Sequence, residues 1–169
     1  DDNSSATCVA TLYWHNNSVN CLAFHPTLPL LATSSSTTVR LWSFSPDGST
    51  AAGGAILNEH RGTVLSVAFH PTAPLLATGS ADGNAKLWRF SADGATATCV
   101  ATLEGDLTST LPVAFDPTKH WLAVGDEVGS VKLYQLEQSL GVGSDALEQK
   151  PSYYSRVKGQ FGRLKGIFW

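Results

Sequence analysis

Short apolar runs rich in β-favouring residues alternate with turn signals along most of the chain. In the clearest stretch, the apolar runs are residues 64–69, 75–79, 85–90 and 97–103. The first run ends at His70-Pro71, and Asp82-Gly83 separates the second from the third. An Asp-Gly pair between two such runs is a strong hairpin signal. The pattern therefore predicts four short antiparallel strands in each unit of about 45 residues.

The same unit recurs along the chain. Two aromatic columns mark its copies: Phe24, Phe69 and Phe115, followed by Trp42, Trp88 and Tyr134. The spacings are 45 and 46 residues in the first column and 46 in the second. Residues 7–12 (TCVATL) also recur letter for letter as residues 98–103. A repeat of this length made of four strands is typical of one propeller blade. We therefore expect an all-β fold of about three four-stranded antiparallel blades.

Composition and charge support this architecture. The chain is 43% hydrophobic and only 15% charged, which fits strands that are buried on both faces. Residues 1–149 contain 14 acidic and 6 basic residues, a net charge of −8. Residues 150–169 contain five basic residues and no acidic one, a net charge of +5. Nucleic-acid binding needs a basic surface, so we do not expect it of the blades.

Residues 75–88 (LLATGSADGNAKLW) resemble the core motif of the WD-repeat β-propeller family, and His60 occupies the place of its Gly-His signature. The resemblance covers residues 7–136. It implies a buried, hydrogen-bonded tetrad of histidine, Ser/Thr, aspartate and tryptophan in each blade. In the middle copy, the corresponding residues are His60, Thr78, Asp82 and Trp88. A buried carboxylate needs donors, which an imidazole and turn amides can supply.

The other two copies depart from this pattern. The first copy has the partial set His15, Thr33 and Trp42. Its turn at Ser36 lacks an aspartate and is one residue shorter. The third copy has Asp106, Val124, Val128 and Tyr134 at the four positions. We therefore expect the full tetrad in the middle blade alone, with apolar packing or neighbours stabilising the outer two.

The repeat units extend over about residues 7–43, 52–90 and 97–136 when each is counted from its outer strand. In the family this stagger lets the first outer strand join the last three strands and close the ring. Propellers use about four to eight blades, so three units predict an incomplete ring. Further blades, a second copy or a neighbour in a complex should cover the open faces. The chain contains no methionine, so we also expect that sequence lies upstream of it or was removed.

Residues 137–169 read as a linker followed by a basic, aromatic tail. Its apolar residues recur on one helical face: Tyr153, Val157, Phe161, Leu164 and Phe168. Three glycines weaken that helix, so it would form only against another surface. The tail either packs irregularly on the propeller or anchors a partner protein. Contact with a membrane surface or a nucleic acid is a further alternative.

These features favour a protein–protein interaction scaffold. Loops held by a rigid sheet commonly carry binding. The candidate partner-binding residues are Asn16, Asn17, Ser36, Arg61, Ala81, Leu107, Thr108 and Glu127. The alternatives are an accessory subunit of an organellar or membrane-associated complex, anchored by the C-terminal segment, and the sensor part of a larger enzyme or signalling protein.

Several other functions are not expected. His60, Thr78 and Asp82 could imitate a nucleophile–base–acid triad, but nothing nearby supplies an oxyanion hole or an exposed nucleophile. His25, His70 and Asp116 each precede a proline and are interpreted as turn residues rather than metal ligands. We therefore expect no enzymatic activity, cofactor or metal. The three cysteines show no metal-ligand spacing, and no signal-peptide pattern is present, so an intracellular location is favoured, organelles included.

Overall fold

The computed structural model describes residues 6–104, 110–127 and 129–136, and every regular element in these residues is a β-strand. The strands are β1 (Val19–Phe24), β2 (Leu30–Ser35), β3 (Thr38–Phe44), β4 (Ala51–Leu57), β5 (Val64–Phe69), β6 (Leu75–Ser80), β7 (Asn84–Phe90), β8 (Ala97–Glu104), β9 (Thr110–Phe115), β10 (Trp121–Asp126) and β11 (Val131–Gln135).

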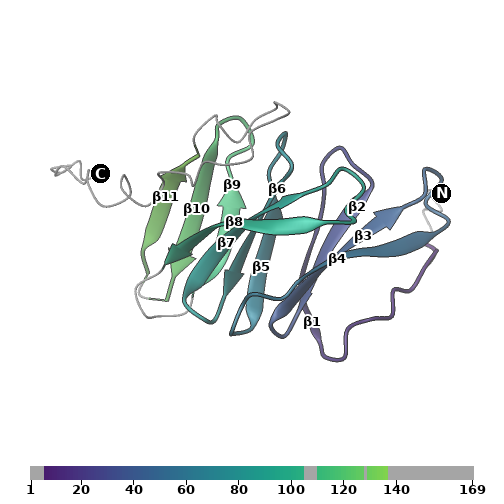
Figure 1. Cartoon of the computed structure of the whole chain (residues 1–169), viewed down its shortest axis with the longest axis horizontal. Helices are drawn as coiled ribbons and strands as arrows, with labels where there is room; N and C mark the ends of the chain where they lie inside the picture. The colour runs from purple at the N-terminus through teal and green to yellow at the C-terminus, as the bar shows by residue number, and fades with distance from the viewer. Residues whose placement is uncertain (1–5, 105–109, 128, 137–169) are drawn as a thin grey trace, which may run out of the picture.

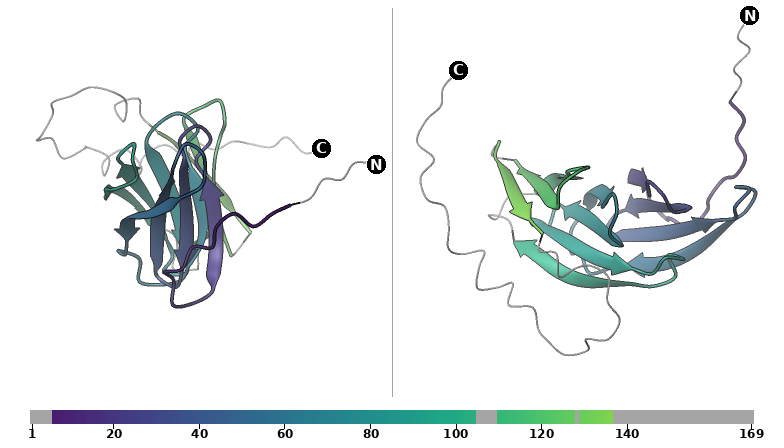
Figure 2. Two further views of the ribbon diagram at one scale, coloured as in Figure 1. Left: turned by 90° about the vertical axis from the view of Figure 1, so that its right-hand side faces the viewer. Right: turned by 90° about the horizontal axis from the view of Figure 1, so that it is seen from above.

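The strands form three antiparallel sheets, each connected in chain order. Blade one consists of β1–β4, blade two of β5–β8 and blade three of β9–β11. The three sheets stand side by side with β1, β5 and β9 along the inner side of an open arc (Figures 1 and 2). The expected all-β architecture of antiparallel blades in an incomplete ring is confirmed.

Blade three has three strands within the residues that the structure describes, and the predicted unit 97–136, counted from its outer strand, contains the four strands β8 to β11. One detail of the prediction was wrong. Residues 7–12 match the outer strand β8 in sequence, yet the stretch 6–15 belongs to no strand. A strand requires a partner edge, and sequence identity supplies only the local preference. In blade two β8 pairs with β7. The strand of blade three that corresponds to β7 is β11, which pairs only with β10 among the described strands.

The core consists of two interfaces between blades. We call the face of a blade that packs on the previous blade its trailing face, and the opposite face its leading face. At the first interface, the leading face of blade one (Leu30, Ala32, Val39 and Leu41) packs on the trailing face of blade two (Val64, Val67, Phe69, Leu76, Trp88 and Phe90). At the second, the leading face of blade two (Leu75, Ala77, Ala85 and Leu87) packs on the trailing face of blade three (Val113, Phe115, Leu122, Val124, Tyr134 and Leu136).

This packing explains the sequence of the second strand in each blade. Alternate residues of a strand point to opposite faces, so a sheet covered on both sides buries every position. All six residues of β2 and of β6 are buried. Their near-continuous apolar and small side chains are therefore required by the fold.

The turns between the first and second strands share one device. His25 Nδ1 accepts hydrogen bonds from the backbone N–H groups of the next turn residues, at 3.1 and 2.9 Å. His70 Nδ1 does the same at 3.2 and 2.9 Å, and Asp116 Oδ1 at 2.8 and 2.7 Å. His70 also stacks on His120 of blade three, with ring centroids 5.4 Å apart. One acceptor thus satisfies two turn amides in every blade.

Candidate partner-binding face and its buried tetrad

In blade two, four side chains from separate segments meet at one end of the sheet. The indole Nε1–H of Trp88 donates to Thr78 Oγ1 over 2.9 Å. Thr78 Oγ1 lies 2.7 Å from His60 Nε2, and His60 Nδ1 lies 2.9 Å from Asp82 Oδ2. Because a carboxylate can only accept, the imidazole proton is on Nδ1, and Nε2 accepts from the Thr78 hydroxyl. The donors therefore run in one direction, from Trp88 to Asp82.

The Asp82 carboxylate also fixes two stretches of backbone. Its Oδ2 accepts from the backbone N–H of Arg61 at 2.8 Å, and its Oδ1 accepts from that of Asn84 at 3.0 Å. Nearby, the Ser80 hydroxyl donates to the carbonyl of Gly62 over 2.9 Å. The loop before β5 is therefore fastened to the turn between β6 and β7. The Arg61 side chain remains exposed on that loop.

The charge state of the pair follows from its surroundings. Burial lowers the pKa of His60, and the hydrogen bond and charge of Asp82 offset this only in part. Burial would raise the pKa of Asp82, but the N–H groups of Arg61, His60 and Asn84 outweigh it and hold that pKa below its usual value. The arrangement is thus a neutral imidazole that donates to an ionised carboxylate.

Blade one keeps half of this network. Trp42 Nε1 donates to Thr33 Oγ1 over 2.8 Å, and His15 Nε2 lies 2.7 Å from the same oxygen. The turn that follows Thr33's strand contains Ser36, whose φ of 49° is positive, and no aspartate. Burial, together with the charge of Arg40, lowers the pKa of His15.

Blade three has an apolar version of the site. Val124 is buried where blades one and two have a threonine, and Tyr134 pairs with Leu122 where they have a tryptophan. The other two positions, Asp106 and Val128, lie outside the described residues. Because valine has no hydroxyl, the Val124 side chain cannot accept a hydrogen bond from the residue at position 134.

A second pair of contacts beside the tetrads was not found from the sequence. In blade one, the Arg40 guanidinium lies 4.0 Å from the ring centroid of Trp14 and 5.0 Å from that of Trp42. In blade two, Lys86 Nζ lies 3.7 Å from Glu59 Oε2 at the corresponding positions. One blade uses a cation–π contact where the next uses an ion pair. The available signal was the residue before each histidine. This residue is Trp14 in blade one and Glu59 in blade two, and each faces a basic residue on the third strand.

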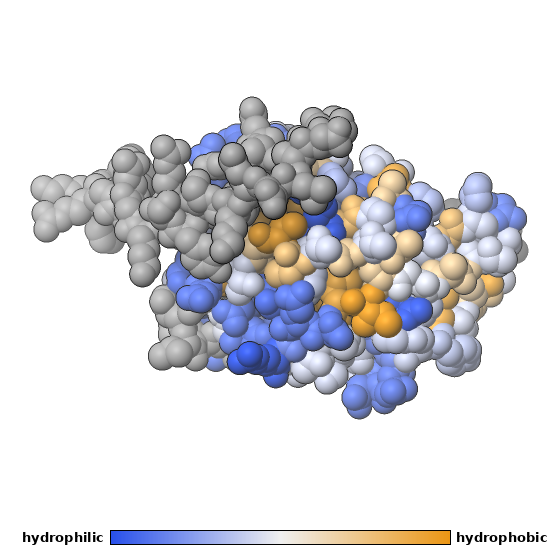
Figure 3. Space-filling view, in the orientation of Figure 1, coloured by the Kyte–Doolittle hydropathy of each residue, from blue (hydrophilic) through white to orange (hydrophobic). Residues whose placement is uncertain are grey.

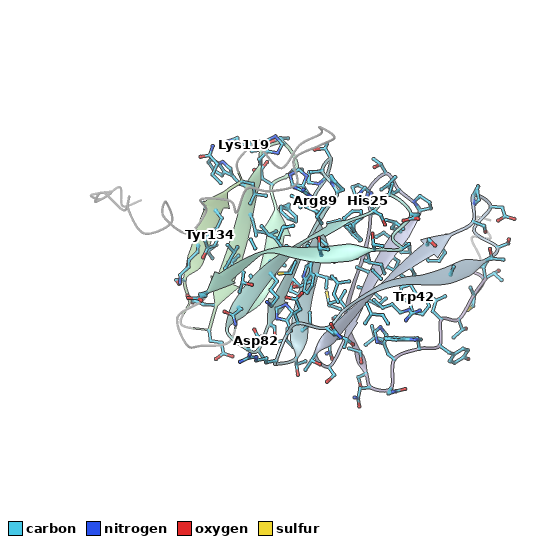
Figure 4. The ribbon with its side chains drawn as sticks, viewed as in Figure 1. His25, Trp42, Asp82, Arg89, Lys119 and Tyr134 are labelled. Atoms are coloured by element: carbon cyan, nitrogen blue, oxygen red, sulfur yellow. The ribbon has the colours of Figure 1, made fainter. Side chains whose placement is uncertain are left out.

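The described candidate partner-binding residues are all exposed and lie in loops at one end of the blades: Asn16, Asn17, Ser36, Arg61, Ala81 and Glu127. In antiparallel sheets, the loop before the first strand and the turn after the second lie at the same end. Asp82 marks this end, and His25 and Lys119 lie at the opposite one (Figure 4). The surface around the Asp82 end is mostly polar (Figure 3).

Some predicted residues cannot be placed. Leu107 and Thr108, and the tail residues Tyr153, Val157, Phe161, Leu164 and Phe168, lie outside the described residues. Within the described part of the chain, no helix is long and apolar enough to cross a membrane.

Comparisons with known proteins agree with the blades. Residues 6–43 and 54–89 match the model of the family "WD domain, G-beta repeat". Residues 110–136, which form blade three, lie beyond the matched segments. No curated protein sequence matches the chain. Residues 6–43 and 54–89 are therefore WD repeats by their match to this family model, and the blades form part of a β-propeller.

A solved structure shares the fold. The crystal structure of Saccharomyces cerevisiae Sqt1 superposes with a TM-score of 0.66 at 24% sequence identity. The match covers 76% of this chain and 34% of that one. The chain therefore spans about a third of the length of that structure. WD repeats typically form scaffolds for protein interaction, and the two matched repeats support this general class for the chain.

Proposed function

We propose that the chain is a non-catalytic scaffold that binds a partner protein through the loops at the Asp82 end of its blades. The observation that carries this proposal is the bond between the Asp82 carboxylate and the backbone N–H of Arg61. It fastens the loop while leaving the Arg61 side chain exposed. A pre-ordered loop loses little conformational entropy on binding, which favours affinity. Arginine is also enriched among residues that dominate protein interfaces.

The second support is continuity between blades at this end. The backbone N–H of Val64 in blade two donates to the carbonyl of Ser36 in blade one over 2.7 Å. Ser34 Oγ also donates to the carbonyl of Val64 over 3.2 Å. The loops of blades one and two are therefore held at a fixed separation. A partner can contact both without reorganising them.

The same geometry argues against catalysis at the tetrad. The Thr78 side chain, which would have to be the nucleophile, is fully buried, and its hydroxyl oxygen accepts from Trp88. A nucleophile must reach its substrate, and this hydroxyl is buried and hydrogen-bonded to Trp88 and His60. The tetrad acts as a support for the loops.

A matched pair of charge reversals tests this function. The full chain, used as bait, should retain a distinct set of proteins from an extract of its source. Arg61→Glu should deplete that set, whereas Arg89→Glu, an exposed arginine at the other end of the sheet, should leave it unchanged. Equal retention by both variants would show that the Asp82 end is not the binding face.

A further inference from the structure

The arc has two open ends, and the repeats within it reveal what each end is built to contact (Figure 2). On the leading face of blade three, Val131 is 67% exposed and Leu133 is 60% exposed. The corresponding residues of blade two, Ala85 and Leu87, are 1% and 3% exposed because blade three covers them. The leading face of blade three therefore has the composition of an internal interface and lacks its cover among the described residues.

The trailing face of blade one is the opposite case. Leu22 is 58% exposed and Phe24 is 66% exposed, whereas the corresponding Val67 and Phe69 of blade two are 6% and 8% exposed. Val67 and Phe69 are buried by the leading face of blade one. Both interfaces between the described blades thus join a leading face to a trailing face. The two open faces are one of each kind.

We propose that these two faces are occupied by a second copy of the chain, joined head to tail at both ends. The leading face of blade three in one copy packs on the trailing face of blade one in the other. The two internal interfaces are the template for this contact, since the same positions meet in each. Two such contacts related by a twofold axis would close a ring of six blades, within the range that propellers use. The proposal is independent of partner binding at the Asp82 end.

An independent observation comes from the N-terminal segment. Cys8 Sγ lies 3.5 Å from the Ala10 carbonyl oxygen and 3.9 Å from Thr11 Oγ1. In β8, Cys99 makes the same two contacts with Ala101 and Thr102 at the same distances. Residues 7–12 thus have the local bulged shape of an outer strand, although they belong to no sheet. Residues 7–11 are also exposed, with Val9 at 80%.

The edge that fits this segment is β11 of the other copy. β11 corresponds to β7, the strand that pairs with β8, and it pairs only with β10 among the described strands. In blade two, Cys99 pairs with Trp88 and Leu103 with Ala85. The equivalent register pairs Cys8 with Tyr134 and Leu12 with Val131 across the two chains. This addition would complete blade three with its fourth strand.

Mass measurement of the full 169-residue chain by light scattering and sedimentation tests the proposal. We expect a species of twice the 17.9 kDa chain mass. Phe24→Asp and Leu133→Asp should each give monomers, because each places a charge on one of the two apolar faces. Ala92→Asp, at an exposed turn away from both faces, should stay dimeric. Circular dichroism of the two monomeric variants should be unchanged, since both side chains are mostly exposed in the single chain.

Mixing the two variants decides the geometry. In a head-to-tail pair, the Phe24→Asp chain keeps a sound leading face and the Leu133→Asp chain a sound trailing face. The mixture should therefore form a heterodimer through one intact contact, while each variant alone stays monomeric. A wild-type monomer would overturn the proposal and leave both faces to some other occupant. Two like faces in contact would also overturn it, because one of the two variants would then remain a homodimer.

The strand contribution has its own variants. Proline lacks the N–H that a ladder requires, so Val9→Pro and Ala10→Pro together remove a donor whichever residue faces β11. We expect the dimer dissociation constant to rise roughly tenfold or more. Ala6→Pro, just before the segment, should have little effect. An unchanged dimer in the Val9/Ala10 variant would exclude strand addition by residues 7–12.

Discussion

Trp88 and Thr78 are joined by the same hydrogen bond as Trp42 and Thr33, from indole Nε1 to threonine Oγ1, at 2.9 and 2.8 Å. The two blades differ in what lies beyond the histidine. In blade two, His60 reaches the Asp82 carboxylate, whereas the turn of blade one contains Ser36 and no acid. Comparing the two blades therefore shows how much the carboxylate contributes to the stability of the fold.

Replacing Asp82 with Ala should destabilise the chain by about 1–3 kcal/mol, because buried donors on His60 and the loop backbone would lose their acceptor. Ser36→Ala, in the corresponding turn of blade one, should cost less than about 0.5 kcal/mol. Denaturant unfolding of the two variants provides the comparison. Equal losses would mean that the carboxylate contributes no more than an exposed turn residue.

Stability should fall as the pH is lowered from 7 to about 5.5. Burial lowers the pKa of His60, and likewise those of His15, His25 and His70, so the folded chain binds fewer protons than the unfolded one below the ordinary histidine value of about 6.5. The free energy of unfolding therefore increases as the pH rises through this window. It decreases as the pH falls, because protonation of these imidazoles favours the unfolded chain. The depressed pKa of Asp82 adds a further loss only at lower pH, near and below about 3.9.

Denaturant midpoints at several pH values measure this slope, and the NMR shift of the His60 ring protons reports its own titration. We expect His60 in the folded chain to titrate below the ordinary histidine pKa of about 6.5. A folded chain that is equally stable at pH 7 and 5.5, or more stable at the lower value, would contradict the assignment of His60 as a buried neutral donor.

Two adjacent glycines of β4 should respond differently to alanine. A Cβ at Gly54 would collide with the backbone carbonyl of Gly94 in the next blade, which also accepts the N–H of Ala55 at 2.8 Å. At Gly53 the atoms nearest to an added Cβ all belong to the end of the flexible Arg40 side chain. Gly54→Ala should therefore cost about 1–3 kcal/mol, as overpacking does, and Gly53→Ala less than about 1 kcal/mol.

Thermal unfolding of the two variants gives the comparison, and the Arg40→Ala background adds a control. Gly53→Ala should become neutral or stabilising there, since the colliding guanidinium is absent and alanine restricts the unfolded chain. The Gly54→Ala penalty should persist in the same background, because its collision is with the main chain. Equal penalties for both glycines would show that the contact between β4 and the Gly94 turn is not rigid.

The sequence was sufficient for the strands of blade two because their signals are local. Alternation and the Asp82-Gly83 turn predicted each strand bound to within one residue of the structure. Residues 7–12 show the limit of such reasoning. Their sequence gives them the shape of β8, down to the contacts of Cys8, but pairing depends on an edge elsewhere.

Contacts between elements were harder to anticipate. Arg40 and Trp14 are 26 positions apart, and the link between them becomes visible only when Lys86 and Glu59 are seen to occupy the same places in the next blade. His70 could be assigned to a turn from the proline that follows it, but its stacking on His120 depends on how blades two and three pack. Such contacts are set by the arrangement of blades, which no single repeat encodes.

Blade three offers a test of why the tryptophan and threonine occur together. Val124 is buried, so Val124→Thr places a hydroxyl in the core of blade three. Tyr134 has no indole N–H to donate to this hydroxyl, as Trp88 donates to Thr78 in blade two. A buried hydroxyl without a partner should cost about 1–3 kcal/mol. Adding Tyr134→Trp supplies an indole N–H at the position from which Trp88 donates in blade two, so the double variant should recover at least half of that loss. Tyr134→Trp alone, with Val124 unchanged, should not raise the free energy of unfolding. A double-mutant cycle on unfolding free energies isolates the coupling between the two positions. If the two changes simply add, the bond between tryptophan and threonine is not what makes a buried threonine tolerable in blades one and two.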